Sequence, residues 1–207
     1  MARSKSSNRW MQEHFEDEYV KQAQAQGYRS RAVFKLKEIQ EKDQLIKPGM
    51  NIVDLGAAPG GWCQYARQLI GKHNKLVALD ILPMEALENV LFIQGDFRDE
   101  AILDQLYEVL AGEPIHLVMS DMAPNMSGNK SIDHPSAIYL CELALDAAKT
   151  VLAKDGCFLV KVFQGEGFEK FHRDVQQQFS KVAIRKPKAS RPRSNEVYIL
   201  AKGFKLP

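Results

Sequence analysis

Short apolar runs alternate with amphipathic stretches from residue 51 to the end of the chain. The runs are rich in β-branched residues and predict strands at 51–55, 75–79, 91–93, 115–120, 157–163, 181–185 and 196–201. Between them, apolar residues at helical spacing predict helices near 62–70, 100–110, 136–153 and 168–179. This alternation is typical of an α/β fold, here a seven-stranded, mostly parallel sheet with helices on both faces.

Both ends of this pattern carry further information. Upstream, apolar residues at positions 32, 33, 36 and 39 predict a helix that carries Lys35 and ends before the stop at residues 47–49. Downstream, the segment 186–195 is too short for a crossover helix, so the last strand should run antiparallel. We predict a flexible basic tail at residues 1–8 and a single domain at 9–207.

Composition narrows the function classes. The 207 residues include 28 Lys and Arg against 26 Asp and Glu, so affinity for nucleic acid must come from where the basic residues cluster. No apolar run approaches the roughly 18 residues of a membrane span, and the start of the chain lacks the apolar stretch of a signal peptide. The 3 cysteines and 5 histidines are scattered without metal-ligand spacing. These features favour a cytoplasmic protein without a membrane segment or a bound metal.

A glycine-rich turn, residues 56–61, follows the first sheet strand and leads into a helix, which is where open α/β sheets bind nucleotides. It lacks both the GxGxxG spacing and the lysine of a phosphate-binding loop, so a polyanionic ligand is disfavoured. Asp80 ends the next strand, where it can accept hydrogen bonds from ribose hydroxyls, and Asp96 follows the third, where it can accept from an adenine amino group. S-adenosylmethionine fits this set; the alternative is a tight turn with ordinary strand-end aspartates. Asp54, inside the first strand, is suited equally to holding the turn through backbone N–H groups and to binding.

Charged residues stand where the pattern expects apolar residues or strand ends. Asp121 directly follows the strand at 115–120, Lys161 lies within an otherwise apolar strand, and Glu196 opens the last strand. A buried lysine is costly unless it is paired. Together with Lys35 these residues are candidates for chemistry beside the cofactor, and the alternative is that they form salt bridges at strand ends.

The runs VDLGAAPGGW, SDMAPNMSG, VKVFQGEGF and RSNEVYI are long and specific. With them the chain resembles the FtsJ/RrmJ family of ribosomal RNA 2′-O-ribose methyltransferases, from about Trp10 almost to the C-terminus. The resemblance implies a Rossmann-like methyltransferase fold that uses S-adenosylmethionine, and a substrate uridine in the A loop of 23S rRNA within the large (50S) ribosomal subunit. The implied cofactor contacts are Gly60, Trp62, Asp80, Asp96 and Asp121. The implied catalytic residues are Lys35, Asp121, Lys161 and Glu196, with no departure from the family pattern.

The chemistry of the four charged residues agrees with such a reaction. A ribose 2′-hydroxyl is a poor nucleophile while protonated, so its methylation needs a base and a group that fixes the hydroxyl in line with the sulfonium. Burial and the nearby cation Lys35 favour a neutral Lys161 that could act as the base, whereas Asp121 and Glu196 favour the ammonium form. The residues alone leave open whether Lys161 removes the proton or positions the hydroxyl while Asp121 or water takes the proton.

Basic residues cluster towards both ends of the chain, and the second cluster contains no acid between Lys181 and Arg193. It directly precedes Glu196, so phosphates bound there would lead a ribose toward the active strand. The alternative is a solvated loop. The predicted RNA-binding residues are Arg29, Arg31, Lys186, Lys188, Arg191 and Arg193.

Rival functions differ in features that this sequence lacks. Methyltransferases of exocyclic base amines carry an aromatic residue that stacks on a flipped base, and the segment from Asp121 to Asn125 has none. The missing GxGxxG disfavours a dehydrogenase, and an assembly factor that only binds rRNA has no need for buried charges. A ribose 2′-O-methyltransferase acting on tRNA is the strongest alternative, because the catalytic residues do not distinguish RNA substrates. We expect a monomer.

Overall fold

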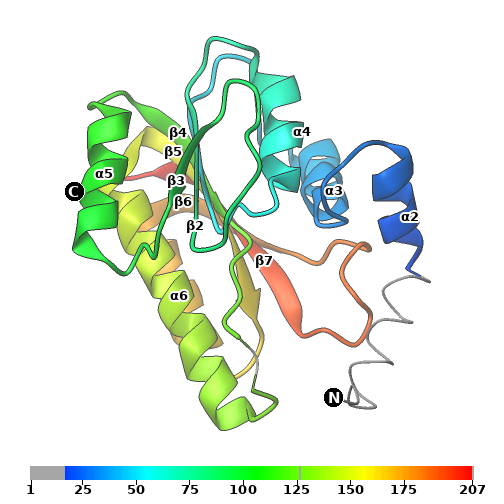
Figure 1. Ribbon diagram of the computed structural model, residues 1–207. Coiled ribbons are helices and arrows are strands. Elements are labelled where there is room, and N and C mark those ends of the chain that lie inside the picture. Colours follow the sequence, from blue (N-terminus) through cyan, green and yellow to red (C-terminus); the bar gives the residue numbers. More distant parts are fainter. Residues whose placement is uncertain (1–16, 126, 207) are drawn as a thin grey trace.

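The computed structural model describes residues 17–125 and 127–206, so the predicted tail at 1–8 lies outside the described residues. At its centre is a seven-stranded sheet of order β3-β2-β1-β4-β5-β7-β6 (Figure 1). The strands are β1 Ile52–Leu55, β2 Leu76–Asp80, β3 Leu91–Gln94, β4 Ile115–Ser120, β5 Leu152–Phe163, β6 Phe179–Arg185 and β7 Glu196–Phe204. β7 is antiparallel to β5 and β6, whereas the pairs among β1 to β5 are parallel. The predicted fold class is therefore confirmed, including the antiparallel last strand.

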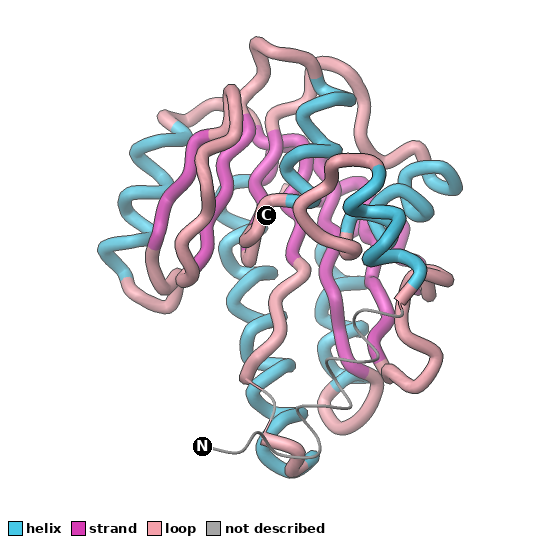
Figure 2. The backbone as a smooth tube through the Cα atoms, turned by 45° about the vertical axis from the view of Figure 1, so that its right-hand side comes forward, coloured by secondary structure: helices cyan, strands magenta, loops and turns pink. Residues whose placement is uncertain are grey.

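Helices cover both faces of the sheet (Figure 2). They are α2 Glu18–Ala25, α3 Val33–Asp43, α4 Gly61–Ile70, α5 Glu100–Leu110, α6 Lys130–Val151 and α7 Phe168–Gln178. Buried residues of α5, α6 and α7 form one core with alternate strand residues such as Val53, and those of α3 and α4 form a second core with the opposite set, such as Ile52. Because side chains alternate along a strand, each face of the sheet has a core of its own.

The order of the strands places the switch in sheet topology between β1 and β4. From β1 the chain passes through α4 to β2 on one side, and from β4 it passes through α6 to β5 on the other. These connections leave in opposite directions, and open α/β sheets bind ligands at the carboxyl ends of strands at such a point. Both strands are buried almost throughout, as expected for central parallel strands.

The helix α2 was not predicted from the sequence. It buries only Val20 and Ala23, a stripe too narrow to stand out in a polar segment. The carboxylate of Asp17 caps the helix by accepting a hydrogen bond from the backbone N–H of Tyr19, at 3.0 Å. Ala23 belongs to a small core with Phe34 of α3, and α2 lies outside α3 (Figure 1). Tertiary packing therefore stabilises a helix that its own sequence specifies weakly.

The boundary between α6 and β5 also differs from the prediction. The predicted helix began after Pro135, but α6 begins six residues earlier because Asn129 caps its N-terminus. The carboxylate of Asp133 accepts a hydrogen bond from the backbone N–H of Ser127 at 2.8 Å, which ties this start to the loop after β4. At the other end β5 begins at Leu152 instead of residue 157. Its pairing with β4 shifts register after Leu152, and the intervening residues include Asp155 in a left-handed conformation with φ 64°. Such an irregularity resembles a loop in sequence.

Candidate active site

Asp121, Lys161 and Tyr198 meet at the carboxyl end of β4. Lys161 lies on β5 opposite Tyr198 of β7, and Asp121 follows the last residue of β4, the strand beside β5. The Lys161 ammonium nitrogen, Nζ, lies 3.1 Å from Asp121 Oδ1 and donates a hydrogen bond to the Asp121 carbonyl oxygen at 2.6 Å. The Tyr198 hydroxyl donates to the same Oδ1 at 2.6 Å. The lysine is thus paired, as a buried charge requires.

A second ion pair lies on the same face of the sheet. Glu196 is two residues before Tyr198 on β7, so both side chains point towards the face that α3 covers. Lys35 of α3 reaches Glu196 Oε1 at 2.6 Å, and Lys35 Nζ lies 5.7 Å from the centre of the Tyr198 ring. The structure therefore brings together all four charged residues that the sequence singled out. They do form salt bridges, and Asp121 and Lys161 lie at the carboxyl end of β4, where open α/β sheets bind ligands.

Burial and paired charges act in opposite directions on the two carboxylates. Burial alone would raise the pKa of Asp121, but the charges of Lys161 and Lys35 and the hydrogen bond from Tyr198 outweigh it and hold this pKa below its usual value. Burial would likewise raise the pKa of Glu196, and the charge of Lys35 lowers it. Both carboxylates are therefore ionised at neutral pH, and their pairing with the lysines is lost only as the pH falls through these depressed pKa values.

Tyr198 is a functional candidate that the sequence analysis missed. Its side chain is fully buried, and burial together with the nearby charge of Asp121 raises its pKa well above the usual value, so the hydroxyl stays a hydrogen-bond donor. The available signal was its spacing from Glu196, since residues i and i+2 of a strand share a face. A tyrosine on a β-strand is otherwise an ordinary core residue, which is why the pattern did not mark it.

Replacing Tyr198 with phenylalanine tests its effect on Asp121. The substitution removes the hydrogen bond that lowers the pKa of Asp121, so the acid limb of the pH–rate profile should move to higher pH. The single-turnover rate of the methyl transfer that the family resemblance implies should fall about ten-fold, the usual scale for one hydrogen bond to a charged group. Tyr107→Phe on α5 is the matched control and should leave the profile as it is. An unchanged acid limb in Tyr198→Phe would show that Tyr198 only packs.

The glycine-rich turn lies against the segment that carries Asp121. A Cβ atom on Gly56, whose φ is 78°, would come within 2.3 Å of Met122 Cγ. Beside it, Asp80 accepts hydrogen bonds from the backbone N–H of Ala58 at 2.8 Å and of Leu82 at 2.9 Å, one on each carboxylate oxygen. Each oxygen keeps acceptor capacity for a further donor, so this carboxylate suits the two hydroxyls of a ribose. The residues present therefore fit S-adenosylmethionine.

Asp54 does not hold the glycine turn through backbone N–H groups, one of the two roles that the sequence left open. Its Oδ2 accepts a hydrogen bond from the Cys63 thiol at 3.0 Å, and its Oδ1 is buried without a hydrogen-bond partner in the part of the chain that the structure describes. Burial raises the pKa of Asp54 to about 7, helped by the charges of Asp121 and Asp80 and opposed by the Cys63 hydrogen bond. The side chain instead contacts Cys63 of α4, and no backbone N–H group of the described turn donates to it.

Two further residues of the predicted cofactor site have protein partners. The carboxylate of Asp96 is held by the Arg98 guanidinium, which donates to both of its oxygens, so an adenine amino group would share this carboxylate with Arg98. The Trp62 side chain is buried, and its indole N–H donates to the Ala32 carbonyl oxygen at 2.8 Å. Cofactor contacts by Asp96 and Trp62 remain predictions.

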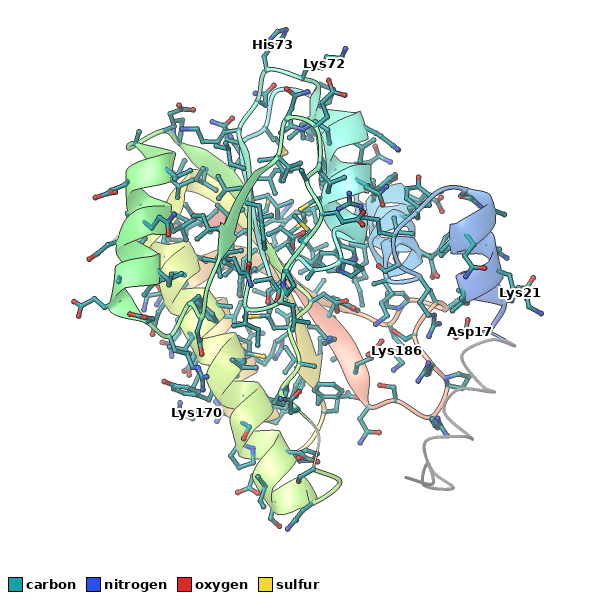
Figure 3. All side chains as sticks on the ribbon, in the orientation of Figure 1. Asp17, Lys21, Lys72, His73, Lys170 and Lys186 are labelled. Carbon is teal, nitrogen blue, oxygen red and sulfur yellow. The ribbon has the colours of Figure 1, made fainter. Side chains whose placement is uncertain are left out.

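The predicted RNA-binding residues fall into two groups. Arg29 and Arg31 donate to backbone carbonyl oxygens, and Arg31 also pairs with Asp17 at 3.0 Å. Lys186 closes the loop before β7 by donating to the carbonyl oxygens of Ser194 in that loop and of Glu196 at the start of β7. It lies on the same side of the molecule as Asp17 (Figure 3).

The remaining three lie on the segment 188–193. Lys188 and Arg193 are exposed, and Arg191 is half-buried. Within the described part of the chain, the side chains of Lys188 and Arg191 make no ion pair. These two are the strongest candidates for phosphate contacts.

None of the described helices is long and apolar enough to cross a membrane. Among the same residues, no group of three or more histidine, cysteine, aspartate or glutamate side chains could hold a metal ion.

The sheet and the charged residues at its switch point define an α/β protein of the Rossmann-like type, and comparisons with known proteins show its family. A family model described as FtsJ-like methyltransferase matches residues 28–204, and the chain belongs to this family. The resemblance noted in the sequence is thereby confirmed.

Individual relatives extend over the full chain. A protein of Cellvibrio japonicus named ribosomal RNA large subunit methyltransferase E is 58% identical and covers 99% of this chain and 97% of its own. A protein of the same name from Pseudomonas aeruginosa is 56% identical and covers 99% of both. Among solved structures, a Plasmodium falciparum protein assigned as a ribosomal RNA methyltransferase is 31% identical, with a TM-score of 0.73 over 86% of this chain and 98% of that one.

Proposed function

We propose that the protein transfers a methyl group from S-adenosylmethionine to the ribose 2′-hydroxyl of a uridine in the A loop of 23S rRNA, within the large ribosomal subunit. The observation that carries this proposal is the pair of ion pairs, Lys161–Asp121 and Lys35–Glu196, beside the glycine-rich turn. A methyl transfer to a hydroxyl needs the oxygen aligned and its proton accepted. Lys161 can align the hydroxyl, and Lys161, Asp121 or water can accept the proton.

Each residue of the site has a distinct task in this proposal. When bound, the cofactor supplies an electrophilic methyl group. Lys161 contacts the 2′-hydroxyl. As the oxygen takes up the methyl group, its proton passes to Lys161 or, where Lys161 holds the hydroxyl as an ammonium, to Asp121 or water. Asp121 orients Lys161 through the 3.1 Å contact and is itself held by Tyr198. Glu196 fixes Lys35, whose charge stabilises the ionised Asp121.

The names of the relatives support the RNA substrate. Proteins that are 56–58% identical over nearly the whole chain are named as methyltransferases of large-subunit ribosomal RNA. The uridine, the A loop and the 2′ position come from the family resemblance and from the chemistry of the site. The same proposal includes a single domain over residues 9–207 that acts as a cytoplasmic monomer.

One experiment tests the reaction and the substrate together. Labelled S-adenosylmethionine is supplied with free 23S rRNA, intact large subunits or tRNA, and the modified nucleoside is identified. We expect 2′-O-methyluridine in the A loop, formed fastest in large subunits. A base-methylated product would overturn the chemistry, and 2′-O-methylation of tRNA alone would establish the rival substrate.

Phosphate contacts by the loop before β7 can be tested through their salt dependence. Replacing Lys188 and Arg191 with glutamine should weaken RNA binding and reduce the slope of log K against log salt by roughly one for each lost contact. Lys72→Gln is the matched control, because Lys72 is exposed on a different side of the molecule (Figure 3). An unchanged slope in the double variant would show that this loop is solvated and does not contact phosphates.

A further inference from the structure

The segment from Gly27 to Ala32, which precedes α3, is fastened to α4. Gln64 of α4 accepts a hydrogen bond from the backbone N–H of Arg29 at 2.8 Å and donates to the Gly27 carbonyl oxygen at 3.2 Å. Trp62 donates to the Ala32 carbonyl oxygen at 2.8 Å. The start of the helix that carries Lys35 is therefore fixed against the helix that follows the glycine-rich turn.

The guanidinium of Arg29 joins two other segments. Its Nη1 donates to the carbonyl oxygen of Pro59 at 3.2 Å and to that of Glu85 at 2.7 Å, and its Nη2 donates to that of Ala86 at 2.9 Å. Pro59 lies in the glycine-rich turn, whereas Glu85 and Ala86 lie in the loop after β2. An arginine can satisfy several fixed acceptors at once because its donors form a rigid planar fork, which a lysine lacks.

These two segments carry the residues predicted to hold the cofactor. On the inner side, Asp80 at the end of β2 accepts a hydrogen bond from the backbone N–H of Ala58 in the turn. On the outer side, a Cβ atom at Gly60 would lie 2.9 Å from Leu87 Cδ1 and 3.2 Å from Arg29 Nη1, so the turn and the loop touch there. Arg29 and Asp80 therefore both connect the glycine-rich turn to the end of β2 and the loop that follows it.

We propose that Arg29 is a positioning residue of the cofactor site and does not bind RNA phosphates. Its hydrogen bonds to three carbonyl oxygens set the distance between the glycine-rich turn and the loop that follows Asp80. Its backbone, held by Gln64, joins both segments to the start of α3. Its side chain is 20% exposed, and three guanidinium hydrogen bonds already go to the protein. This inference rests on the proposed function, because it takes S-adenosylmethionine as the ligand of the turn.

Two variants separate a positioning role from a phosphate contact. Arg29→Lys keeps the charge but loses the fork, and Arg29→Ala loses both. If Arg29 positions the turn, both variants should weaken S-adenosylmethionine binding about ten-fold or more in calorimetry without RNA, because hydrogen bonds from a charged group are lost. Their KM for the cofactor should rise in proportion, while kcat at saturating cofactor stays within about two-fold. The salt dependence of RNA binding should not change.

A phosphate contact makes the opposite prediction. Cofactor affinity would then be unchanged in both variants, the RNA slope would fall by about one in Arg29→Ala, and lysine would restore it. That result would overturn the proposal. Arg173→Ala, an exposed arginine on α7, is the matched control for cofactor affinity and RNA slope. If the wild-type protein itself bound no S-adenosylmethionine, the proposed function would fail first, which distinguishes the two failures.

Discussion

Replacing Lys161 with alanine is expected to reduce methyl transfer by about 10²-fold or more, the usual scale for the loss of a positioned base or donor. Lys161 lies within β5, and its ammonium group contacts both the carboxylate and the carbonyl oxygen of Asp121. The measurement is single-turnover transfer to large subunits at saturating cofactor, because slow product release can hide a chemical defect. Near-normal rates would refute a catalytic role and direct attention to Asp121.

A second substitution at the same position separates the two roles that Lys161 could have. Arginine keeps a positive charge and hydrogen-bond donors but cannot give up its proton, so Lys161→Arg should restore little if Lys161 removes the proton and appreciably if it only positions the hydroxyl. Lys170→Ala, an exposed lysine on α7, is the matched control (Figure 3). Calorimetry of cofactor binding and circular dichroism should show that the Lys161 variants are folded.

Replacing Asp80 with alanine is expected to weaken S-adenosylmethionine binding by about 2–4 kcal/mol, because two charge-assisted hydrogen bonds to the ribose are removed. The substitution also removes the acceptor of the backbone N–H groups of Ala58 and Leu82, which adds to the loss by loosening the turn. The check is the dissociation constant measured by calorimetry.

Controls distinguish binding from a general loss of structure at Asp80. Asp80→Asn keeps one carbonyl acceptor and should lie between the wild type and alanine. Asp104→Ala removes an exposed acid from α5 and should leave the affinity unchanged. Unchanged affinity in Asp80→Ala, with the protein folded by circular dichroism, would remove Asp80 from the cofactor site.

The sequence alone predicts the fold class and two of the charged residues of the site. Alternating β-branched runs and amphipathic stretches predict the α/β sheet, because the side-chain periods of strands and helices differ. The short segment before Glu196 predicts the antiparallel strand, because ten residues leave no room for a crossover helix. Asp121 and Lys161 also stand out in the sequence, because burying an unpaired charge costs free energy and such a residue therefore has a partner or a function.

The pairing of the charged residues was decided only by tertiary structure. Lys35 and Glu196 are 161 positions apart, and no local pattern shows that α3 covers the face of β7 on which Glu196 lies. The position of Tyr198 beside Lys161 depends on the register between β5 and β7, which pairs these two residues. Likewise, the sequence does not show which groups a basic residue contacts, so Arg29 was predicted to bind phosphate. In the fold its guanidinium donates hydrogen bonds to three carbonyl oxygens. Local sequence determines which side chains are available, whereas long-range packing determines which of them meet.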